Sequence, residues 1–314
     1  MKYQYIKQHR SAFRVRKMCR ALKVSESGYY RWCGKGQSKR ARENEQLILK
    51  IRQIHRKSKQ RYGSPRIAQE LNDSGYHYNE KRIARLMRLG KIAAKTKRRF
   101  KVTTKSKHSL PVAENLVKRK FRASGPNRLW ASDITYIWTG EGWLYLLAIM
   151  DVYSRQIVGW SMSNRLTQEL AIQALQQAIW RRKPLPGCIF HSDRGSQYAG
   201  LEFCKLLKQY GFIQSMSGSG NCYDNAIMET FFHTLKTELV YFERYETRNE
   251  ARRSIFEYIE VFYNRERRHS ALNYKSPIDF ERLAEVALLS VYFFGGSSNT
   301  NLDPIDEDPN YNIL

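Results

Sequence analysis

The spacing of apolar residues changes along the chain, and the change separates a helical first part from a second part that contains strands. Up to about residue 94, apolar side chains recur every three or four positions, which is typical of short amphipathic helices. From residue 125 onward, β-branched and aromatic runs alternate with helical patterns. We expect five strands there, over residues 128–138, 143–152, 156–162, 188–191 and 212–216.

The order of these elements predicts an α/β fold. A Thr-Gly-Glu-Gly turn at 139–142 joins the first two strands into a hairpin, and the later strands alternate with helices. We expect these helices over residues 167–182, 199–210 and about 224–239, the last after a polar loop at 217–221. Hairpins followed by alternating strands and helices predict a mixed sheet covered by helices.

The helices of the first part are short and several have capping residues. One is expected over residues 12–22, and Ser25 is placed to cap the next, which runs through Trp32. A third is expected over residues 43–58. Ser64 is expected to cap a helix that Pro65 opens, and Asn79 to cap the helix 80–89.

The last two of these helices have the pattern of a helix-turn-helix. We expect Ile83, Leu86 and Met87 to face inward. A short helix, a turn and a second helix rich in arginine is typical of a module whose second helix enters the major groove of DNA. The alternative is a small helical bundle with a solvated basic face. The residues expected to contact DNA are Lys81, Arg82, Arg85 and Arg88.

The charge of the chain supports a polyanionic partner. The 314 residues include 55 Lys+Arg and 29 Asp+Glu, a net charge of +26. Residues 1–122 hold 36 basic and 7 acidic residues (net +29), whereas residues 123–314 hold 19 and 22 (net −3). Such a concentration of positive charge is typical of nucleic-acid binding. A disordered charge-rich arm is the alternative, and the apolar periodicity argues against it.

Other classes of protein are disfavoured by composition. The five cysteines are odd in number and show no CxxC spacing, which indicates a reducing compartment rather than a disulfide framework. The polar, basic N-terminus does not resemble a signal peptide, and no apolar run is long enough to span a bilayer. We therefore expect a cytoplasmic protein without a membrane partner.

Three acidic residues are the best candidates for catalysis. Asp133 lies in an apolar strand, Asp193 follows a strand, and Glu229 lies in an amphipathic helix, with 35 residues between the second and the third. Three carboxylates brought together by a sheet and a helix can hold two Mg²⁺ ions, for which Mn²⁺ can substitute. Two such ions, about 3.5–4 Å apart, stabilise both the attacking and the leaving oxygen of an in-line displacement. The pattern favours phosphoryl chemistry on nucleic acid.

Two residues share the helical face of Glu229. Asn225 precedes it by four positions and Lys236 follows it by seven, so all three are expected on one side of the helix. We therefore expect Asn225 and Lys236 to contact DNA, with Lys236 at a phosphate near the metal ions, although on its own Lys236 could equally be a solvated helix lysine.

Further polar residues have more than one interpretation. Asp151 could be a fourth acidic group of the site, but we favour a hydrogen-bonding residue at the end of a strand. His191 could orient the site, contact DNA or pack inside the protein, and Asp224 is expected to be the N-cap of the helix of Glu229. A basic turn is expected to contact the DNA backbone, with a solvated loop as the alternative; its residues are Arg265, Arg267, Arg268 and His269.

Four segments of the second part together resemble the DDE transposases of bacterial insertion sequences. They are residues 128–138, 191–198 (HSDRGSQY), 221–236 (NCYDNAIMETFFHTLK) and 263–280 (YNRERRHSALNYKSPIDF). More narrowly, they resemble the product of the second of two overlapping reading frames. Residues 61–92 and 24–32 resemble the helix-turn-helix region of the same proteins, so the resemblance covers about residues 12–282.

The resemblance carries expectations about fold and function. It implies a ribonuclease H-like fold shared with retroviral integrases, with Asp133, Asp193 and Glu229 as metal ligands and Lys236 as a contact to the DNA end. It implies a transposase that binds the terminal inverted repeats of its element and catalyses strand cleavage and strand transfer into target DNA. The implied partners are double-stranded DNA, a first-frame protein or fusion, and further copies of the chain on DNA.

The expected organisation has five segments. A helical DNA-binding segment (1–42) and a helix-turn-helix domain (43–94) precede a basic linker (95–124), of which 95–107 is expected to be extended along phosphates. An integrase-type core (125–282) and a C-terminal extension (283–314) follow.

The extension departs from the family pattern, and two rival functions stay open. Proteins of this family usually end soon after the Ser276-Pro277 motif, and we expect residues 295–314 to be disordered or to act as an acidic tail that mimics DNA. One alternative function is a catalytically inactive DNA-binding regulator of transposition. The other is a ribonuclease H-type nuclease, against which the long basic region argues.

Overall fold

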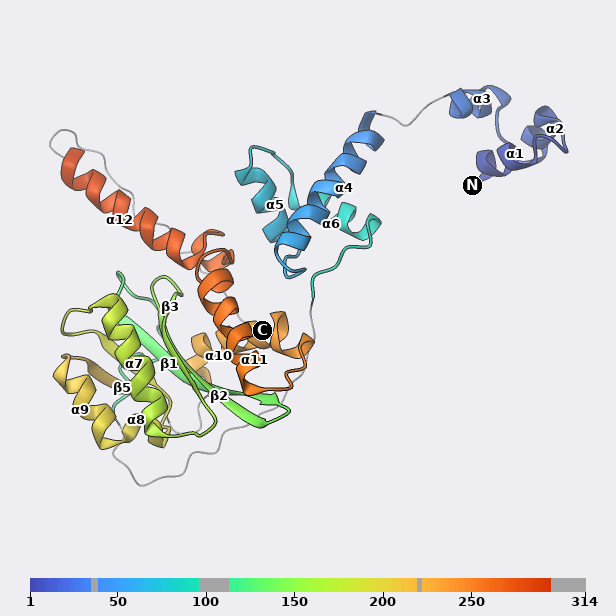
Figure 1. Cartoon of the computed structure of the whole chain (residues 1–314). Helices are drawn as coiled ribbons and strands as arrows, with labels where there is room; N and C mark the ends of the chain where they lie inside the picture. Colours follow the sequence, from blue (N-terminus) through green and yellow to red (C-terminus); the bar gives the residue numbers. More distant parts are fainter. Residues whose placement is uncertain (35–38, 96–112, 219–221, 295–314) are drawn as a thin grey trace. The chain divides into compact units, whose positions relative to one another are not determined.

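The computed structural model describes residues 1–34, 39–95, 113–218 and 222–294 (Figure 1). Its chain divides into two compact units, Met1–Lys95 and Thr96–Leu314. No helix in the described ranges is long and apolar enough to cross a membrane. Most of the predicted linker segment at 95–107, the loop residues 219–221 and the predicted tail at 295–314 lie outside the described residues.

Three short helices open the first unit. The helices α1 (Lys2–His9), α2 (Val15–Ala21) and α3 (Glu26–Gly34) enclose a small core of Ile6, Met18, Cys19 and Tyr29. The helix predicted over 12–22 is therefore shorter than expected, and α1 was not predicted. The Ser25 hydroxyl accepts a hydrogen bond of 3.0 Å from the Gly28 N–H, which confirms Ser25 as the cap of α3.

The next three helices form the predicted helix-turn-helix region. They are α4 (Lys39–Lys57), α5 (Ser64–Asp73) and α6 (Glu80–Leu89). The Asn79 side chain accepts from the Lys81 N–H at 2.8 Å, so its predicted capping role is confirmed. The prediction for Ser64 is wrong, because the helix begins at Ser64 with Gly63 as its N-cap and no side-chain cap. As predicted, Ile83, Leu86 and Met87 are buried.

The second unit is built on a five-stranded sheet. Its strands are β1 (Leu129–Thr139), β2 (Gly142–Asp151), β3 (Ile157–Ser163), β4 (Ile189–Ser192) and β5 (Ile213–Met216), in the spatial order β3-β2-β1-β4-β5. The pairs β1–β2 and β2–β3 are antiparallel, whereas β1–β4 and β4–β5 are parallel. This is the mixed, ribonuclease H-like arrangement that we predicted.

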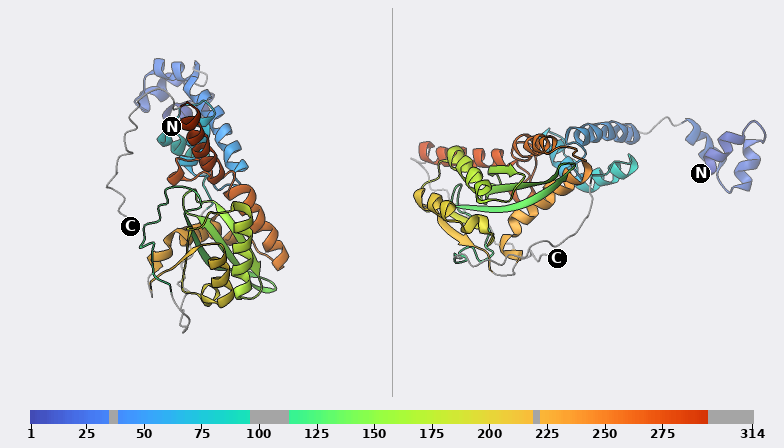
Figure 2. Two further views of the ribbon diagram at one scale, coloured as in Figure 1. Left: turned by 90° about the vertical axis from the view of Figure 1, so that its left-hand side faces the viewer. Right: turned by 60° about the horizontal axis from the view of Figure 1, so that its bottom comes forward.

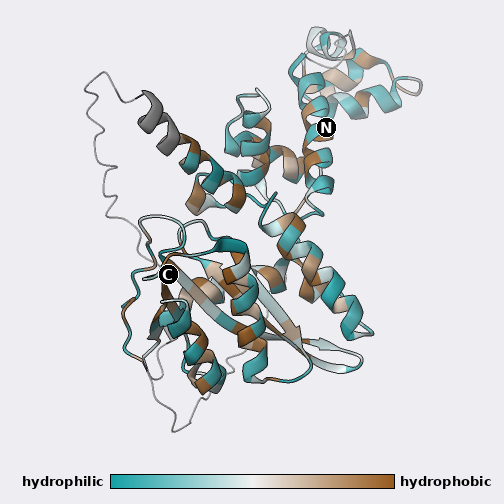
Figure 3. Cartoon of the chain, turned by 60° about the vertical axis from the view of Figure 1, so that its left-hand side comes forward, coloured by the Kyte–Doolittle hydropathy of each residue, from teal (hydrophilic) through white to brown (hydrophobic). Residues whose placement is uncertain are grey.

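One face of the sheet is covered by α7 (Gln168–Arg182), α8 (Ser196–Ala199) and α9 (Leu201–Gln209). Trp130, Leu147 and Ile149 pack with these helices in the main hydrophobic core. The two further views of Figure 2 show α7 lying along the strands. In Figure 3 the helices carry hydrophobic stripes beside hydrophilic ones, as expected for elements that cover a sheet.

The remaining helices follow β5. The 3₁₀ turn η1 (Cys222–Asn225) leads into α10 (Ala226–Glu238), which contacts β1, and η2 (Val240–Phe242) follows. Next, α11 (Arg248–Phe256) continues as the π-helix η3 (Glu257–Tyr263). The 3₁₀ turn η4 (Ser270–Leu272) and α12 (Pro277–Phe294) complete the described chain. The predicted extension at 283–314 is thus helical up to Phe294.

Residues 113–124 differ from the linker that we expected, because part of this segment packs on the core. Val117 is 6% exposed, and Ala113 packs against the main core. The Asn115 side chain donates to Asp224 at 2.9 Å. The second half of the predicted linker therefore contributes to the structure of the second unit.

Gly159 in β3 offers a test of the packing between β3 and α7. A Cβ atom there would lie 2.3 Å from the Ala174 carbonyl oxygen and 2.7 Å from the Ala178 Cβ, so a methyl group does not fit. We predict that Gly159→Ala lowers the free energy of unfolding by about 1–3 kcal/mol, measured by urea denaturation. Gly125→Ala is the control, since a Cβ there meets nothing within 4 Å. Equal stability of both variants would contradict this packing.

Candidate active site

The sheet register brings the first two predicted catalytic acids together. In the parallel pair of β1 and β4, Ala131 lies opposite His191. Asp133 and Asp193 each follow that pair by two residues. Since side chains two positions apart point to the same face of a strand, the two carboxylates leave neighbouring strands at the same level. The Asp133 carboxylate accepts from the Ile134 N–H at 2.8 Å, and that of Asp193 accepts from the Gly195 N–H at 2.9 Å.

The charges of the third acid and of the lysine also act on Asp133. Glu229 lies in the first turn of α10 and is exposed. Burial raises the pKa of Asp133 well above its ordinary value, and the neighbouring carboxylates of Asp193 and Glu229 raise it further. Lys236 acts in the opposite direction. The three acids and the lysine are thus close enough for their charges to interact at Asp133.

Lys236 lies between the acids and an aromatic ring. Its Nζ is 5.5 Å from the centroid of the Tyr136 ring on β1, a cation–π geometry. Burial lowers the pKa of Lys236, while the charge of Asp133 acts to raise it. The contact between Lys236 and Tyr136 was not predicted. The aromatic residues at every second position of the hairpin, Tyr136 and Trp138 on β1 and Trp143 and Tyr145 on β2, were a signal for it.

Asn225 joins the start of α10 to β1 instead of facing solvent. It is 6% exposed, and its Nδ2 donates to the Ser132 carbonyl at 3.1 Å, next to Asp133. Its Oδ1 is buried without a hydrogen-bond partner among the described residues. A direct contact of Asn225 with DNA would require this segment to open.

His191 and Asp224 hold the connection between β5 and α10. His191 is fully buried; its Nε2 donates to the Asp224 carbonyl at 2.7 Å, and its Nδ1 lies 2.9 Å from the Ser215 hydroxyl. Burial lowers the pKa of His191 and favours the neutral ring. Of the three interpretations of His191, internal packing that positions the site is the one the structure supports.

The predicted N-cap role of Asp224 is wrong, because Asn225 occupies the N-cap of α10. The Asp224 carboxylate accepts instead from the Gly218 N–H at 2.8 Å and from Arg119 Nε at 3.2 Å. Burial alone would raise the pKa of Asp224, but these hydrogen bonds hold it below its ordinary value. Arg119 and Asn115 were missed because their partner lies more than 100 residues away.

Asp151 is the hydrogen-bonding strand-end residue that we favoured. It is fully buried, and its carboxylate accepts from the Asn127 N–H at 2.7 Å and the Tyr153 N–H at 3.0 Å. Arg182 on α7 contacts it at 3.3 Å and also pairs with Glu281 on α12 at 2.6 Å. This network connects the end of β2, the end of α7 and the first turns of α12.

The basic turn after η3 lies partly inside the protein. The Arg267 guanidinium is buried and pairs with Glu238 at the end of α10, with a shortest separation of 2.8 Å. Arg268 donates to the Tyr274 carbonyl at 3.0 Å and is half-buried, whereas Arg265 is exposed. Arg267 is therefore occupied within the protein, and Arg265 is the residue of this turn that is most accessible to DNA.

In the helix-turn-helix region, the predicted DNA-binding residues Lys81, Arg85 and Arg88 are exposed on α6. Arg82 is half-buried; it donates to the Asn44 side chain at 3.1 Å and lies over the Tyr78 ring at 5.2 Å. Three of the four residues thus present their charges to solvent.

In the described part of the chain, no three His, Cys, Asp or Glu side chains converge closely enough to hold a metal ion. The acidic residues nevertheless fit a divalent cation chemically. They are oxygen donors, which Mg²⁺ prefers, and a bound cation would favour the charged form of Asp133, which burial and the neighbouring carboxylates disfavour.

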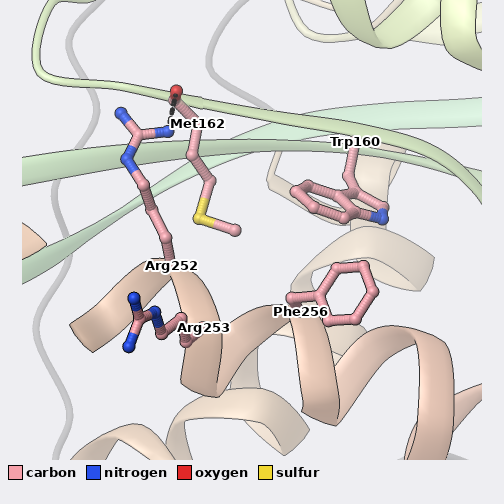
Figure 4. A pocket seen from close by; sticks show the side chains of 5 residues that line it. All are labelled: Trp160, Met162, Arg252, Arg253 and Phe256. Atoms are coloured by element: carbon pink, nitrogen blue, oxygen red, sulfur yellow. Dashed lines mark hydrogen bonds between the residues drawn. The ribbon is translucent and has the colours of Figure 1, made fainter. Parts of the chain in front are cut away.

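A pocket of about 340 Å³ lies elsewhere, between β3 and α11 (Figure 4), and none of the three acids lines it. Arg252 crosses it to donate to the Met162 carbonyl at 2.6 Å. Its lining residues are Trp160, Met162, Arg252, Arg253 and Phe256.

Comparisons with protein families agree with the two-part architecture. Residues 123–222 and 229–283 match families described as "Integrase core domain", and residues 41–100 match a family described as "HTH-like domain".

The chain is similar to named proteins over most of its length. It is 45% identical to "Transposase InsF for insertion sequence IS3A" of Escherichia coli (strain K12) over 283 residues, which cover 90% of this chain and 98% of that protein. It is also 45% identical to "Insertion element IS600 uncharacterized 31 kDa protein" of Shigella sonnei, over 84% of this chain and 97% of that protein.

Solved structures of integrases resemble the chain more distantly. The simian T-cell lymphotropic virus intasome in complex with a PP2A regulatory subunit matches with 15% identity and a TM-score of 0.44, over 84% of this chain and 80% of that chain. The HTLV-2 integrase catalytic core domain in complex with magnesium matches with 18% identity and a TM-score of 0.40, over 51% of this chain and 99% of that chain.

The ion pair of Arg267 and Glu238 generates a prediction about stability. Arg267→Ala leaves the Glu238 charge buried without its partner, so we expect the free energy of unfolding to fall by about 3–5 kcal/mol in a denaturant titration. Arg265→Ala, on the exposed side of the same turn, is the control and should change stability by less than about 0.5 kcal/mol. Full stability of the Arg267 variant would mean that the pair does not form in solution.

Proposed function

The chain belongs to the insertion-sequence transposases of the IS3 type with an integrase core domain, and we propose that it binds the ends of its element and catalyses metal-dependent strand cleavage and strand transfer. The observation that carries this proposal is the register of β1 and β4, which sets Asp133 beside Asp193, together with the charge of Glu229 that acts on Asp133. A cluster of carboxylates at the edge of a core domain, with a lysine beside it, suits a phosphodiester substrate.

The proposed metal ligands are Asp133, Asp193 and Glu229, and the proposed ion is Mg²⁺ in two copies, with Mn²⁺ as a substitute. When bound, such ions activate the attacking oxygen and stabilise the leaving oxygen. Because Glu229 is exposed, its side chain is free to turn toward the two aspartates. Lys236 pairs with a phosphate of the DNA end next to the acids.

The remaining groups position these side chains. Asn225 ties the start of α10 to the carbonyl that precedes Asp133, and Glu238 ties the end of α10 to Arg267. Glu229 is therefore presented by a helix that is fixed at both ends. His191 and Asp224 hold the segment that leads into it.

DNA binding is assigned mainly to the first unit. The exposed Lys81, Arg85 and Arg88 on α6 face the DNA, where charge-assisted contacts to phosphate give affinity. The partners in this proposal are the terminal inverted repeats, target DNA, a first-frame protein or fusion, and further copies of the chain on DNA. The reaction takes place in the cytoplasm, where bacterial DNA lies.

Substitution of the acids tests the catalytic part of the proposal. Asp133→Asn, Asp193→Asn and Glu229→Gln should each lower Mg²⁺-dependent joining of a labelled terminal-repeat duplex by about 100-fold or more, because each removes a metal ligand. Binding of the same duplex should stay within about twofold, since DNA is held mainly by the basic unit.

The matched control is Glu202→Gln, an acid on α9 with a side chain that is 65% exposed. It should leave joining unchanged. If the wild-type chain binds the duplex but joins nothing in Mg²⁺ or Mn²⁺, the protein is a DNA-binding regulator and the catalytic proposal is wrong.

The salt dependence of binding tests the role of α6. Each phosphate contact contributes about −0.9 to the slope of log K against log salt. Arg85→Ala and Arg88→Ala should therefore each reduce the steepness of that slope by about 0.9, measured by fluorescence anisotropy between about 50 and 200 mM salt. Lys205→Ala, an exposed lysine on α9, should leave the slope unchanged. An unaltered slope in the arginine variants would place the DNA contact elsewhere.

A further inference from the structure

We propose that the aromatic side chains of the β1–β2 hairpin form a stacking platform for unpaired DNA bases, farther along β1 than the proposed catalytic acids. The platform is defined as Tyr136, Trp138, Trp143 and Tyr145 together with Lys236. The proposal rests on the proposed function, since cleavage at the element's end leaves a strand whose last bases can separate from their partners.

The rings form one continuous cluster. Trp138 lies directly opposite Trp143 in the hairpin, and Tyr136 lies opposite Tyr145, so all four leave the same face of the two strands. The ring centroids are 4.8 Å apart for Trp138 and Trp143, 5.4 Å for Tyr136 and Trp143, and 6.5 Å for Tyr136 and Tyr145.

The two tryptophans are accessible to a ligand. Trp138 is 62% exposed and Trp143 is 44% exposed. They meet edge to face, at 76°, so the ring faces are not both used in the contact. An exposed group of large aromatic side chains at the tip of a hairpin indicates a binding surface, and a flat π-face can stack on a base of any identity.

The hairpin is held rigidly where the rings lie. The Gly140 N–H donates to the Tyr245 carbonyl at 2.9 Å, and Arg248 donates from Nε to the Trp143 carbonyl at 3.1 Å and from its N–H to Glu141 at 2.8 Å. The approach is so close that a Cβ on Gly140 would lie 2.5 Å from the Glu246 carbonyl oxygen. A platform fixed in this way loses little conformational entropy when a base binds.

Lys236 connects the platform with the acids. Its ammonium group lies over the Tyr136 ring at 5.5 Å, and its charge acts on Asp133. Trp138 is five residues beyond Asp133, about 17 Å along the strand at roughly 3.3 Å per residue. That length corresponds to a few nucleotides, so a strand whose reacting phosphate lies at Asp133 passes Lys236 and reaches the rings.

Among the described residues, no strand pairs with the edge of β1 that lies between the acids and the rings. Alternation along β1 places Tyr136 and Trp138 on the opposite face from Asp133. The pairing of β4 with β1 ends at Ala131, so β4 does not cover β1 at this level. Lys236 contacts the Tyr136 ring, and its positive charge there favours a passing phosphate over an apolar protein partner.

Binding of an overhang tests the platform without catalysis. The full chain is mixed, in EDTA, with a duplex that carries a three-nucleotide single-stranded 3′ overhang containing 2-aminopurine, and with the blunt duplex of the same sequence. Stacking on the platform quenches the 2-aminopurine fluorescence. Trp138→Ala should weaken binding of the overhang duplex by about tenfold and remove the quenching, while binding of the blunt duplex stays unchanged.

Two variants serve as controls. Trp138→Phe keeps a stacking ring and should retain most of the quenching. Trp180→Ala removes a tryptophan on α7 that is 77% exposed and should behave as wild type. Thermal unfolding checks that each variant is folded, and Trp143→Ala repeats the test on the neighbouring ring.

Several outcomes would overturn the proposal. Equal loss of affinity for both duplexes in Trp138→Ala would mean that Trp138 contacts DNA in general. Unchanged quenching in this variant would mean that the overhanging base does not stack on Trp138. A change in oligomeric state with unaltered overhang binding would make this face a protein contact. The overhang-binding assay contains EDTA and does not depend on catalysis. A failure of strand transfer in the separate Mg²⁺ assay would therefore count against the proposed function but not against the platform.

Discussion

The proposed active site depends on one constraint, the parallel register between β1 and β4. With Ala131 opposite His191, the residues two positions further along the chain are Asp133 on β1 and Asp193 just after β4. A shift of one residue on either strand would turn one carboxylate to the other face of the sheet. The hydrophobic residues around the acids therefore act on catalysis indirectly. Trp130 and Phe190 are buried in the core, and their packing holds this register.

The acids of this site disfavour one another's charged forms, and hydrogen bonds from the surrounding polar residues hold them in place. Burial and two neighbouring acids disfavour the charged form of Asp133. Asn225, His191 and Asp224 satisfy backbone groups on both sides of the acids and fix the approach of α10. At the other end of α10, Glu238 is bound by Arg267 and by the Tyr258 hydroxyl. Buried polar contacts thus hold both ends of the helix that carries Glu229.

The sequence predicted the sheet more fully than the polar network. Strands such as 143–152 are long apolar runs whose burial follows from composition, and the acidic triad was recognisable because its motifs are local. Arg267 and Asp224 were misjudged because their partners, Glu238 and Arg119, lie 29 and 105 residues away. No periodic pattern encodes such pairs. Nor could the sequence show that residues 113–124 pack on the core, since their polar composition is that of a linker.

The distribution of charge argues for a division of labour between the two units. Residues 1–122 carry a net charge of +29 and residues 123–314 a net of −3. Non-specific attraction to DNA therefore resides in the first part, and the catalytic core has little of it. A core without a large positive field has to hold a DNA end by short-range contacts. We propose that Lys236 supplies one such contact and that the exposed rings of the β1–β2 hairpin supply a surface on which bases can stack at any salt concentration. Weak long-range attraction in the second unit would also have an advantage. The second unit would then engage only DNA that the first unit has already bound.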